Sequence, residues 1–477
     1  MSTGAPAVDL AVVGAGPAGL AAAVTAAGLG LRVTVLDAGD RPGGQYYRHP
    51  APGLGAARPE ALHHGWSDFA RREAALRAHE SAGRITYLPL HHVWTVVPGG
   101  AAGAHRGPAA PAPEWVLHAV AGHAPGERAA VVTARAVLIA TGAYERQLPF
   151  PGWTLPGVVG AGGAQAMLKA GLVLPGKRVV VAGSGPLLLA VAGSLAAAGA
   201  TVPAVVEAAA YTAYAGQVPA LMRNPGKIVE AAGYGGALAR HRVRLLTRHA
   251  VTEAHGTGRV EAVTVARLDR DWRPLPGTAR RIPCDALAVG HGLVPQLELA
   301  TGLGCATRRS PDGTVALVLD AEQRTSVHGI WSAGETGGIG GAQLAMTEGE
   351  LAAHSIAGVP CGPRLARRRA RLRAFADAMA AAHRPGGGWT EWLRDDTVVC
   401  RCEEVPAGRI REAAEDLGAR DARTVKLLTR AGMGWCQGRM CGPAVAALAG
   451  EEQPADRRPL SCPVPLRQLA ELPPADR

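Results

Sequence analysis

A glycine-rich turn that joins a short apolar strand to a helix occurs twice in this chain of 477 residues. The first copy is Val12-Val13-Gly14-Ala15-Gly16-Pro17-Ala18-Gly19, and the second is Gly183-Ser184-Gly185-Pro186-Leu187-Leu188. In such a turn one glycine allows the sharp bend, the next lets a pyrophosphate approach the backbone, and the third lets the helix pack on the strand. The N-terminus of the helix then faces the anion with free N–H groups. The repeat predicts an α/β fold with two Rossmann-like dinucleotide-binding domains.

The segments after the first turn supply further contacts that a dinucleotide needs. The next strand ends in Asp37, and a carboxylate at this place can bind both hydroxyls of an adenosine ribose. The loop Gly43-Gly44-Gln45 is either an ordinary loop or a place where a flat ring or a phosphate approaches the backbone, with Gln45 bonding to a flavin edge. Two later strand–turn segments, Ala140-Thr141-Gly142 and Ala333-Gly334-Glu335, complete the pattern.

These four elements, in this order, resemble those of flavoproteins with two dinucleotide-binding domains, of the glutathione reductase and thioredoxin reductase type. The resemblance covers residues 8–360 and implies that FAD binds the first unit, with the second unit inserted in the first. The residues that it assigns to FAD are Gly14, Gly16, Pro17, Ala18, Gly19, Asp37, Gly44, Gln45, Thr141, Gly142, Gly334, Glu335 and Gln343. Glu335 departs from the family, which usually has Asp there, but it keeps a carboxylate near the ribitol and pyrophosphate.

The second turn is a weaker nucleotide site, because Leu188 replaces its third glycine and hinders close packing of helix on strand. The strand that follows ends in Glu207, which suits a ribose 2′-hydroxyl and opposes a 2′-phosphate, so that NAD(H) is favoured over NADP(H). The candidate contacts are Gly183, Gly185 and Glu207. Another adenine nucleotide and an empty, structural unit stay open as alternatives.

Four of the eight cysteines form two hooks near the C-terminus, Cys400-Arg-Cys402 and Cys436-Gln-Gly-Arg-Met-Cys441. Four thiolates suffice for a [2Fe–2S] cluster, with each hook ligating one iron. Structural zinc and unligated thiols are the alternatives, and zinc prefers wider hooks in both halves. The module resembles the bacterioferritin-associated ferredoxin-like (BFD-like) [2Fe–2S] domain, which more often ends in C-x-x-C. The other cysteines, Cys284, Cys305, Cys361 and Cys462, are expected to be buried or incidental.

No cysteine precedes Cys284, so the chain lacks the C-x-x-C dithiol that the disulfide reductases carry beside the flavin. Longer phrases narrow the resemblance: Ala140 to Trp153, Thr429 to Cys441, and Pro463 to Leu466. Together they resemble the FAD-containing subunits of heteromeric amine-oxidising dehydrogenases. This group includes the B subunit of hydrogen cyanide synthase, the A subunit of opine oxidases, and α subunits of proline or hydroxyproline dehydrogenases.

The resemblance implies that a separate flavoprotein of the amino-acid oxidase type, the partner in such a complex, oxidises the C–N bond of a small-molecule amine. Electrons then pass through this chain to an acceptor, and a small ferredoxin-like subunit is a further partner. A self-sufficient NADH-dependent reductase is the alternative function. A scaffold or redox-sensing subunit with structural cofactors is a third interpretation. Tyr144, Glu145 and His291 are each interpreted as structural residues rather than general bases, so no catalytic residue is predicted.

The predicted domains follow from the positions of these motifs. They are an FAD-binding domain in two parts (1–150 and 286–384), an inserted NAD(P)-type nucleotide-binding domain (151–285), a linker (385–397), a small helical BFD-like [2Fe–2S] domain (398–450) and a tail (451–477). The basic run Arg364 to Arg373 is interpreted as a solvated helix face, with a docking face for an acidic partner as the alternative.

The composition limits the partners and the location. The net charge of +11 is not accompanied by interleaved aromatics, which make up 4% of the chain, and this argues against nucleic acid as a ligand. The N-terminus lacks the basic leader and apolar run of a secretory signal, and no long apolar stretch occurs. We therefore expect a cytoplasmic protein. The alternative is a peripheral location at a membrane, to which a complex attaches the chain.

Overall fold

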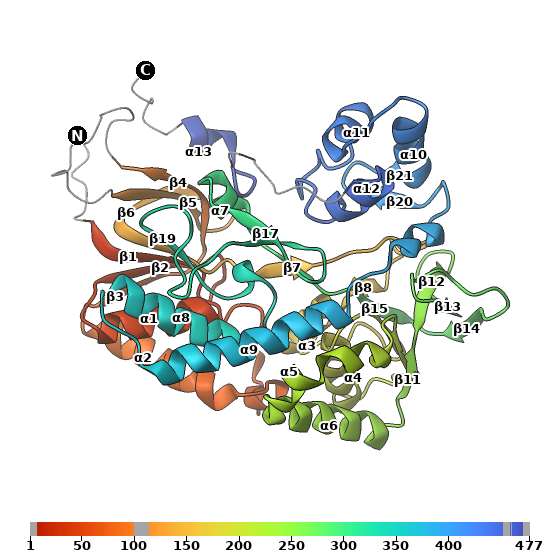
Figure 1. Ribbon diagram of the computed structural model, residues 1–477, viewed down its shortest axis with the longest axis horizontal. Helices are drawn as coiled ribbons and strands as arrows, with labels where there is room; N and C mark the ends of the chain where they lie inside the picture. The colour runs from red at the N-terminus through yellow and green to blue at the C-terminus, as the bar shows by residue number, and fades with distance from the viewer. Residues whose placement is uncertain (1–6, 100–113, 452–457, 459, 471–477) are drawn as a thin grey trace.

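The computed structural model describes residues 7–99, 114–451, 458 and 460–470. Two α/β units lie side by side, and a small helical unit stands on them (Figure 1). The first unit has a sheet with the strand order β3-β2-β1-β6-β5-β4, and β19 pairs with β6. Its strands are β1 (Val8–Val13), β2 (Val33–Leu36), β3 (Ile85–Leu88), β4 (His91–Pro98), β5 (Trp115–Ala121), β6 (Arg128–Ile139) and β19 (Ile330–Ser332).

Three helices pack along this sheet: α1 (Pro17–Gly28), α2 (Trp66–Ser81) and α8 (Ala342–Ile356). The strand β1 is a continuous apolar run that is buried from Leu10 onward, as expected for a parallel strand covered on both faces. α1 is rich in alanine and crosses α8 closely, because a Cβ at Gly349 would lie 2.2 Å from the carbonyl oxygen of Ala18. The short segments η1 (Pro52–Leu54) and η2 (Pro59–Leu62) precede α2, and η4 (Glu335–Gly337) precedes α8.

The second unit has a parallel sheet with the order β11-β10-β9-β15-β8. These strands are β8 (Val158–Gly160), β9 (Val179–Gly183), β10 (Ala204–Glu207), β11 (Arg244–Thr247) and β15 (Ala286–Gly290). An antiparallel sheet of β12 (His249–His255), β13 (Ala262–Arg267) and β14 (Arg280–Pro283) lies beside them. The helices are α3 (Ala161–Gly171), α4 (Leu187–Ala197), α5 (Val218–Met222) and α6 (Pro225–Arg240), with η3 (Tyr211–Gln217) before α5.

The second unit is inserted in the first, because β19 rejoins the first sheet after the second is complete. The two connections between the units pair with each other as β7 (Ala143–Glu145) and β16 (Leu293–Pro295). The predicted boundary between residues 285 and 286 is wrong. β15 begins at Ala286 and hydrogen-bonds to β8 and β9, so the inserted unit continues through Gly290. Beyond β16 the first unit resumes with α7 (Glu298–Gly302), β17 (Thr307–Arg309) and β18 (Val315–Leu317).

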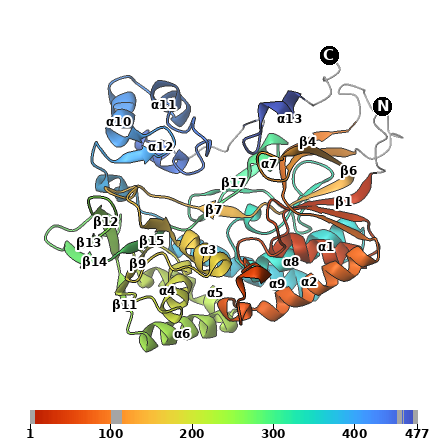
Figure 2. The same cartoon turned by 180° about the vertical axis from the view of Figure 1, so that it is seen from behind.

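A long helix, α9 (Pro363–Ala382), spans both units (Figures 1 and 2). It contacts α8 in the first unit and η3 and α5 in the second. The basic run at its start is only partly the solvated face that the sequence suggests. Four of its arginines are exposed, namely Arg364, Arg367, Arg368 and Arg371. Arg369 and Arg373 instead form ion pairs with Glu348, which is fully buried.

The helical unit contains β20 (Val398–Cys400), β21 (Val405–Pro406), α10 (Ala407–Glu415), α11 (Ala422–Thr429) and α12 (Gly442–Leu448). The preceding segment, predicted as a linker, is packed: η5 (Gly387–Trp392) buries Trp389 and Trp392 in the same core as Trp272 of the second unit. The indole N–H of Trp392 donates to the carbonyl oxygen of Trp272 at 3.0 Å. The helical unit is therefore docked on the second unit rather than tethered to it.

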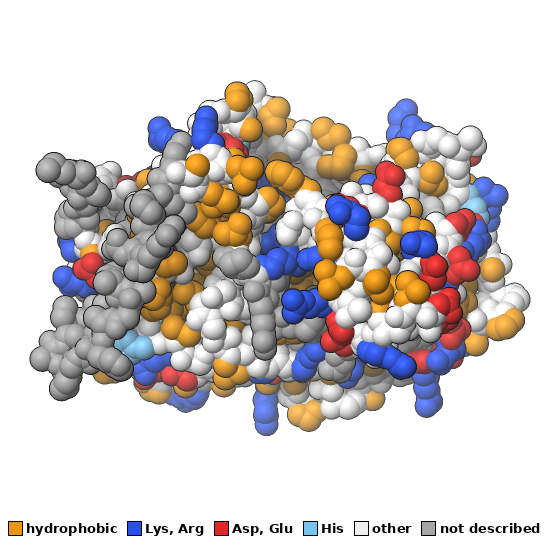
Figure 3. Space-filling view, turned by 90° about the horizontal axis from the view of Figure 1, so that it is seen from above, with side chains coloured by type: hydrophobic (Ala, Val, Ile, Leu, Met, Phe, Trp, Pro, Cys, Tyr) orange, Lys and Arg blue, Asp and Glu red, His pale blue; other side chains and the backbone are white. Residues whose placement is uncertain are grey.

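The end of the chain returns to the first unit. Ser461 donates its backbone N–H to the carbonyl oxygen of Trp94 on β4, at 2.9 Å, and the short helix α13 (Leu466–Ala470) follows. Among the described residues, no helix combines the length and the apolar character needed to cross a bilayer. On the face seen in Figure 3, Lys and Arg side chains are interspersed with acidic and hydrophobic ones.

A buried histidine gives the fold a predictable response to acid. His291 is enclosed with Trp272 and Trp392, and burial lowers its pKa to about 3, from 6.5. Between these values the unfolded chain binds a proton that the folded chain does not, so stability falls as the pH drops from 6.5 toward 3. This loss of stability amounts to up to about 1.4 kcal/mol per pH unit and should be absent in His291→Phe. The measurement is the urea unfolding midpoint as a function of pH, followed by tryptophan fluorescence. The exposed His328, replaced in the same way, should leave the slope as in the wild type.

Candidate cofactor sites

The first glycine turn has the geometry that the sequence predicts. Gly14 has a φ of +103°, and a Cβ there would lie 2.4 Å from the carbonyl oxygen of Ala140. A Cβ at Gly19 would lie 1.8 Å from the carbonyl oxygen of Gly14, so the helix approaches the turn as only glycine allows. Pro17 stands in the first turn of α1 and Ala18 beside it, with Gly16 as the N-cap. The N-terminus of α1 therefore opens onto the end of β1.

Asp37 lies at the carboxyl end of β2, beside this turn. Its carboxylate accepts hydrogen bonds from the N–H of Ala15 and the N–H of Gly39, both at 2.8 Å. Burial raises the pKa of this carboxyl group, and the two backbone donors oppose the rise. Because each carboxylate oxygen can accept a second bond, both remain able to bind ribose hydroxyls.

The loop of Gly43 and Gly44 closes over the turn. The N–H of Gly43 donates to the carbonyl oxygen of Ala15 at 2.8 Å, and a Cβ at Gly44 would lie 2.8 Å from the Cα of Gly16. Two facing glycines leave bare backbone around the place of the pyrophosphate, which fits a dinucleotide. Gln45 is exposed, and its side-chain oxygen accepts from the Arg48 guanidinium at 2.9 Å.

Thr141 and Gly142 follow β6, beside the same turn, and both hold Gln296 of the returning chain. The Thr141 hydroxyl donates to the carbonyl oxygen of Gln296 at 2.7 Å, and the N–H of Gln296 donates to the carbonyl oxygen of Gly142 at 2.9 Å. The predicted flavin-side turn is thus fixed to the segment that leads from β16 into α7.

Glu335 follows β19 and faces the start of α8. Its carboxylate accepts from the N–H of Gly340 at 2.6 Å and from the N–H of Gly341 at 3.0 Å. Burial raises its pKa, and these donors and Arg373 oppose the rise. The longer side chain therefore reaches its own loop, and each oxygen keeps a lone pair for a ribitol hydroxyl. Gln343, in the first turn of α8, is exposed and lines a cavity of ≈ 660 Å³ between the two units, with His64 and Tyr234 on its walls.

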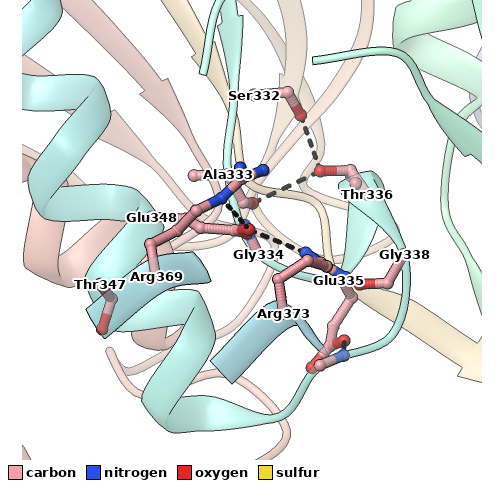
Figure 4. Close-up of polar contacts among 12 residues, drawn as sticks. Ser332, Ala333, Gly334, Glu335, Thr336, Gly338, Thr347, Glu348, Arg369 and Arg373 are labelled. Atoms are coloured by element: carbon pink, nitrogen blue, oxygen red, sulfur yellow. Dashed lines mark hydrogen bonds and ion pairs between the residues drawn. The ribbon is translucent and has the colours of Figure 1, made fainter. Parts of the chain in front are cut away.

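A buried ion pair that the sequence did not reveal supports this loop (Figure 4). The Glu348 carboxylate accepts from the N–H of Gly334 at 3.1 Å and pairs with Arg373 at 2.8 Å and Arg369 at 3.4 Å. Arg373 also donates to the carbonyl oxygen of Gly338 at 2.8 Å. Helix α9 thereby holds the loop that presents Glu335, although no local pattern marks these residues as a pair.

Removal of Glu348 should weaken both the fold and FAD binding. Glu348→Ala leaves the guanidinium of Arg373 buried without its partner, and breaking such a pair costs about 3–5 kcal/mol. The measurements are urea unfolding and FAD release on dialysis. The neighbouring Glu350 pairs with Arg72 at 2.7 Å in a more exposed setting, so Glu350→Ala should cost about 1 kcal/mol or less. Equal losses in the two variants would contradict this role of Glu348.

The second glycine turn repeats the first with one difference. Gly183 and Gly185 both have positive φ, and the Glu207 carboxylate accepts from the N–H of Gly185 at 3.0 Å and the N–H of Ala209 at 2.9 Å. The extra methylene of Glu207 takes it one residue further along the turn than Asp37 reaches in the first. Both acids lie at the carboxyl end of the strand that follows the turn and its helix, which is the place where the sequence predicts a ribose-binding carboxylate.

The end of α9 covers this second turn. His383 lies 3.6 Å from the Glu207 carboxylate, and its ring contacts the hydroxyl of Ser184, in the middle of the turn, at 3.2 Å. Its other ring nitrogen bonds to the Tyr214 hydroxyl. A ribose that binds Glu207 must displace His383 or share the carboxylate with it. No local pattern indicates this contact, because α9 is distant from the turn along the chain.

The four cysteines of the two hooks meet in one place. Cys400 and Cys441 are buried and hydrogen-bonded to each other, whereas Cys402 is exposed and contacts Cys436. The side-chain contacts of the thiols therefore join one hook to the other. In the part of the chain that the structure describes, no three His, Cys, Asp or Glu side chains are grouped as the ligands of a single ion. Four thiols provide the number of ligands that a two-iron cluster needs.

The backbone around the thiols also fits a cluster. The N–H of Gly432 donates to the sulfur of Cys400 at 3.5 Å, and a Cβ at Gly434 would lie 2.2 Å from the Cβ of Cys402. Cys441 is the N-cap of α12, whose first turn contains Pro443. Glycine thus gives the sulfurs both space and an N–H donor, as anionic cluster ligands need.

The residues considered as general bases, Tyr144, Glu145 and His291, lie in places that favour a structural role. Tyr144 and Glu145 lie on β7, and the Glu145 carboxylate accepts from the N–H of Gly162 at 2.8 Å and the N–H of Gly163 at 3.3 Å, at the start of α3. Burial raises the pKa of Glu145, and these donors oppose the rise. His291 is fully buried, with its pKa near 3, and is too weak a base near neutral pH.

Two family descriptions match the chain. Residues 8–349 match the pyridine nucleotide-disulphide oxidoreductase family, and residues 398–451 match the BFD-like [2Fe–2S] binding domain. The HcnB subunit of hydrogen cyanide synthase from Pseudomonas aeruginosa is 37% identical over 441 residues, which are 90% of each chain. The A subunit of opine oxidase from Rhizobium meliloti is 33% identical, over 98% of this chain and 88% of the relative.

A solved structure shows the same fold over nearly the whole chain. L-proline dehydrogenase from P. horikoshii superposes with a TM-score of 0.63 and 20% identity, over 98% of this chain and 80% of that one. The predicted cofactors, FAD and a [2Fe–2S] cluster, are those of the two matching families. The chain belongs to the pyridine nucleotide-disulphide oxidoreductase family, as an FAD-dependent, electron-transferring subunit of dehydrogenase type with a C-terminal BFD-like [2Fe–2S] domain.

Proposed function

We propose that this chain relays electrons in a heteromeric complex whose separate flavoprotein subunit, of the amino-acid oxidase type, oxidises the C–N bond of an amino acid, imino acid or opine. One observation carries the proposal. The second cysteine hook is joined to α7 of the first unit by the ion pair of Arg439 and Glu298, and the alignments with HcnB and with the opine oxidase relative span both the FAD-binding part and the cysteine part of the chain. A small ferredoxin-like subunit is a further candidate partner.

FAD exchanges electrons in pairs and a [2Fe–2S] cluster exchanges them singly, so the two cofactors together convert one mode of transfer into the other. The chain's own residues hold and separate them. Gly14, Gly16 and Gly44 would give the pyrophosphate of FAD access to the backbone, and Asp37 and Glu335 would bind its ribose and ribitol hydroxyls. Cys400, Cys402, Cys436 and Cys441 would hold the cluster, with Cys400 and Cys441 buried and Cys402 open to solvent.

The surroundings of the candidate bases support the assignment of substrate oxidation to a partner. Glu145 caps a helix, and His291 is enclosed with two tryptophans. Amine oxidation requires the loss of a proton from the substrate nitrogen, and neither of these candidates is free to accept it. The chain is therefore equipped to bind redox cofactors and to pass electrons, and less so to activate an amine.

The contact of His383 with Glu207 argues against a self-sufficient NADH reductase. A nicotinamide dinucleotide in the second unit needs this carboxylate for its ribose, but His383 lies against it and is itself held by the hydroxyl of Tyr214. Another adenine nucleotide meets the same obstacle. We therefore assign the second unit a structural role in the relay, with α9 closing its turn.

The test of the proposal is whether amine oxidation requires the partner subunit. The purified chain, loaded with both cofactors, is mixed with proline, hydroxyproline, glycine or an opine, with and without a co-expressed amino-acid-oxidase-type partner. We expect cluster reduction, seen by EPR, only when the partner is present. Oxidation of an amine at the full rate by this chain alone would refute the proposal.

A further inference from the structure

We propose that Arg439, through an ion pair with Glu298, fixes the position of the second cysteine hook (residues 436–441) relative to the flavin-side turn. It thereby sets the rate of electron transfer between the two cofactors. The inference rests on the proposed function, because it assigns a residue to the step that makes the chain a relay. Neither residue is a cofactor contact in the predicted sets. Arg439 is a positioning residue, since it acts through the loop that contains it.

Arg439 lies inside the second hook, between Cys436 and Cys441. Its guanidinium donates to the carbonyl oxygen of Cys436 at 3.3 Å, within the hook. Its Nε lies 2.7 Å from the Glu298 carboxylate, on α7 of the first unit. One side chain therefore contacts both the ligand loop and the unit that binds FAD.

The other end of this contact leads directly to the flavin side. Glu298 begins α7, two residues after Gln296. Gln296 is the residue held by the hydroxyl of Thr141 and the carbonyl oxygen of Gly142, the predicted FAD contacts after β6. The flavin-side turn is thus hydrogen-bonded to Gln296, the backbone leads from Gln296 to Glu298, and Glu298 is paired with Arg439 of the second cysteine hook.

The returning chain reinforces the same contact. Arg439 also donates to the carbonyl oxygen of Ser461. Ser461 is fixed to β4 by two bonds, from its N–H to the carbonyl oxygen of Trp94 at 2.9 Å and from its hydroxyl to the carbonyl oxygen of Val93 at 3.0 Å. The guanidinium is therefore held from two separate places on the first unit.

Burial makes this contact persistent. The Arg439 side chain is 16% exposed and the Glu298 side chain 3% exposed. Breaking a buried ion pair by removing one partner is strongly destabilising, so that separation of the second cysteine hook from α7 is opposed by the loss of this contact. The surface ion pair of Arg409 and Glu412, on α10 of the same helical unit, is by contrast 60% and 44% exposed and joins no other unit.

The experiment compares four variants of the full-length chain loaded with FAD and iron–sulfur. Arg439→Met and Glu298→Gln break the ion pair, Arg439→Lys keeps the charge, and Arg409→Met is the matched control. FAD and iron contents are measured first. Cluster bleaching is then followed after flash photoreduction of the flavin, and hydrogen exchange of residues 436–441 and the EPR relaxation of the flavin radical by the reduced cluster report the docking itself.

Arg439→Met and Glu298→Gln should keep both cofactors but transfer electrons roughly tenfold or more slowly, because the protein's part in the transfer is to hold the two cofactors in position. Their 436–441 loop should exchange faster, and the radical should relax more slowly. Arg439→Lys should recover part of the rate, and Arg409→Met should match the wild type. If Arg439→Met loses its cluster, Glu298→Gln decides, because it leaves the ligand loop intact.

Wild-type rates and relaxation in Glu298→Gln, with both cofactors present, would overturn the inference. A failure of the proposed function would look different. In that case the wild-type chain itself would show no transfer from reduced flavin to cluster, before any variant is compared.

Discussion

Cys441→Ser will abolish the [2Fe–2S] cluster and destabilise the helical unit, while FAD stays bound. Cys441 is 1% exposed, lies in the core of that unit with Cys400, and caps α12. Three thiolates leave one iron with an incomplete ligand set, and a buried, unpaired hydroxyl in place of the sulfur costs a further amount of about 1–3 kcal/mol. Iron and sulfide analysis should give values near zero, and the EPR signal of the reduced cluster should vanish.

The matched control for this change is Cys361→Ser. Cys361 is partly exposed, precedes α9 and is remote from the hooks along the chain. It should keep its iron, its flavin absorbance and its unfolding midpoint. A Cys441→Ser protein with a full complement of iron would contradict the ligand assignment. Equal loss of iron in both variants would indicate general damage instead.

Gly44→Ala will release FAD from an otherwise folded chain. Gly44 has a φ of +58°, and the added Cβ would lie 2.8 Å from the Cα of Gly16. The left-handed backbone costs a non-glycine residue about 1–3 kcal/mol, and the loop must also retreat from the glycine turn. Since each step of about 1.4 kcal/mol is a factor of ten, FAD affinity should fall by about tenfold to a hundredfold.

The control for the glycine is Gly28→Ala, at the end of α1. A Cβ there meets no atom within 4 Å, and the residue lies outside the positive-φ region. Its FAD content after dialysis should equal that of the wild type, with circular dichroism unchanged in both variants. Tight FAD binding by Gly44→Ala would mean that the loop does not shape the pyrophosphate site.

The parts of the molecule that could be predicted from the sequence are those that repeat a local pattern. Gly14 and Gly183 mark sharp turns because only glycine adopts their backbone angles readily, and the neighbouring residues then determine strand and helix. The cysteine hooks are similarly local. The comparisons confirm the predicted fold class, the two cofactors and the family, whereas the individual FAD and nucleotide contacts stay predictions.

The contacts missing from the prediction join residues that are distant along the chain. Glu348 with Arg373, and Glu298 with Arg439, are ordinary charged residues until the fold buries them together. The predicted domain boundary after residue 285 was wrong for the same reason. The sequence of β15 alone does not indicate that this strand pairs with β9 of the inserted unit. The glycines of residues 385–397 indicated a linker, and the sequence alone did not show that its tryptophans are buried.

One measurement tests the central claim most directly: anaerobic titration of the fully loaded chain with NADH, followed by visible and EPR spectra. The relay that we propose predicts a flavin that stays oxidised at high NADH and is reduced by dithionite, because His383, held by Tyr214, lies against the Glu207 carboxylate. Flavin bleaching by NADH, together with the signal of a reduced [2Fe–2S] cluster, would contradict it and make the chain a self-sufficient NADH reductase.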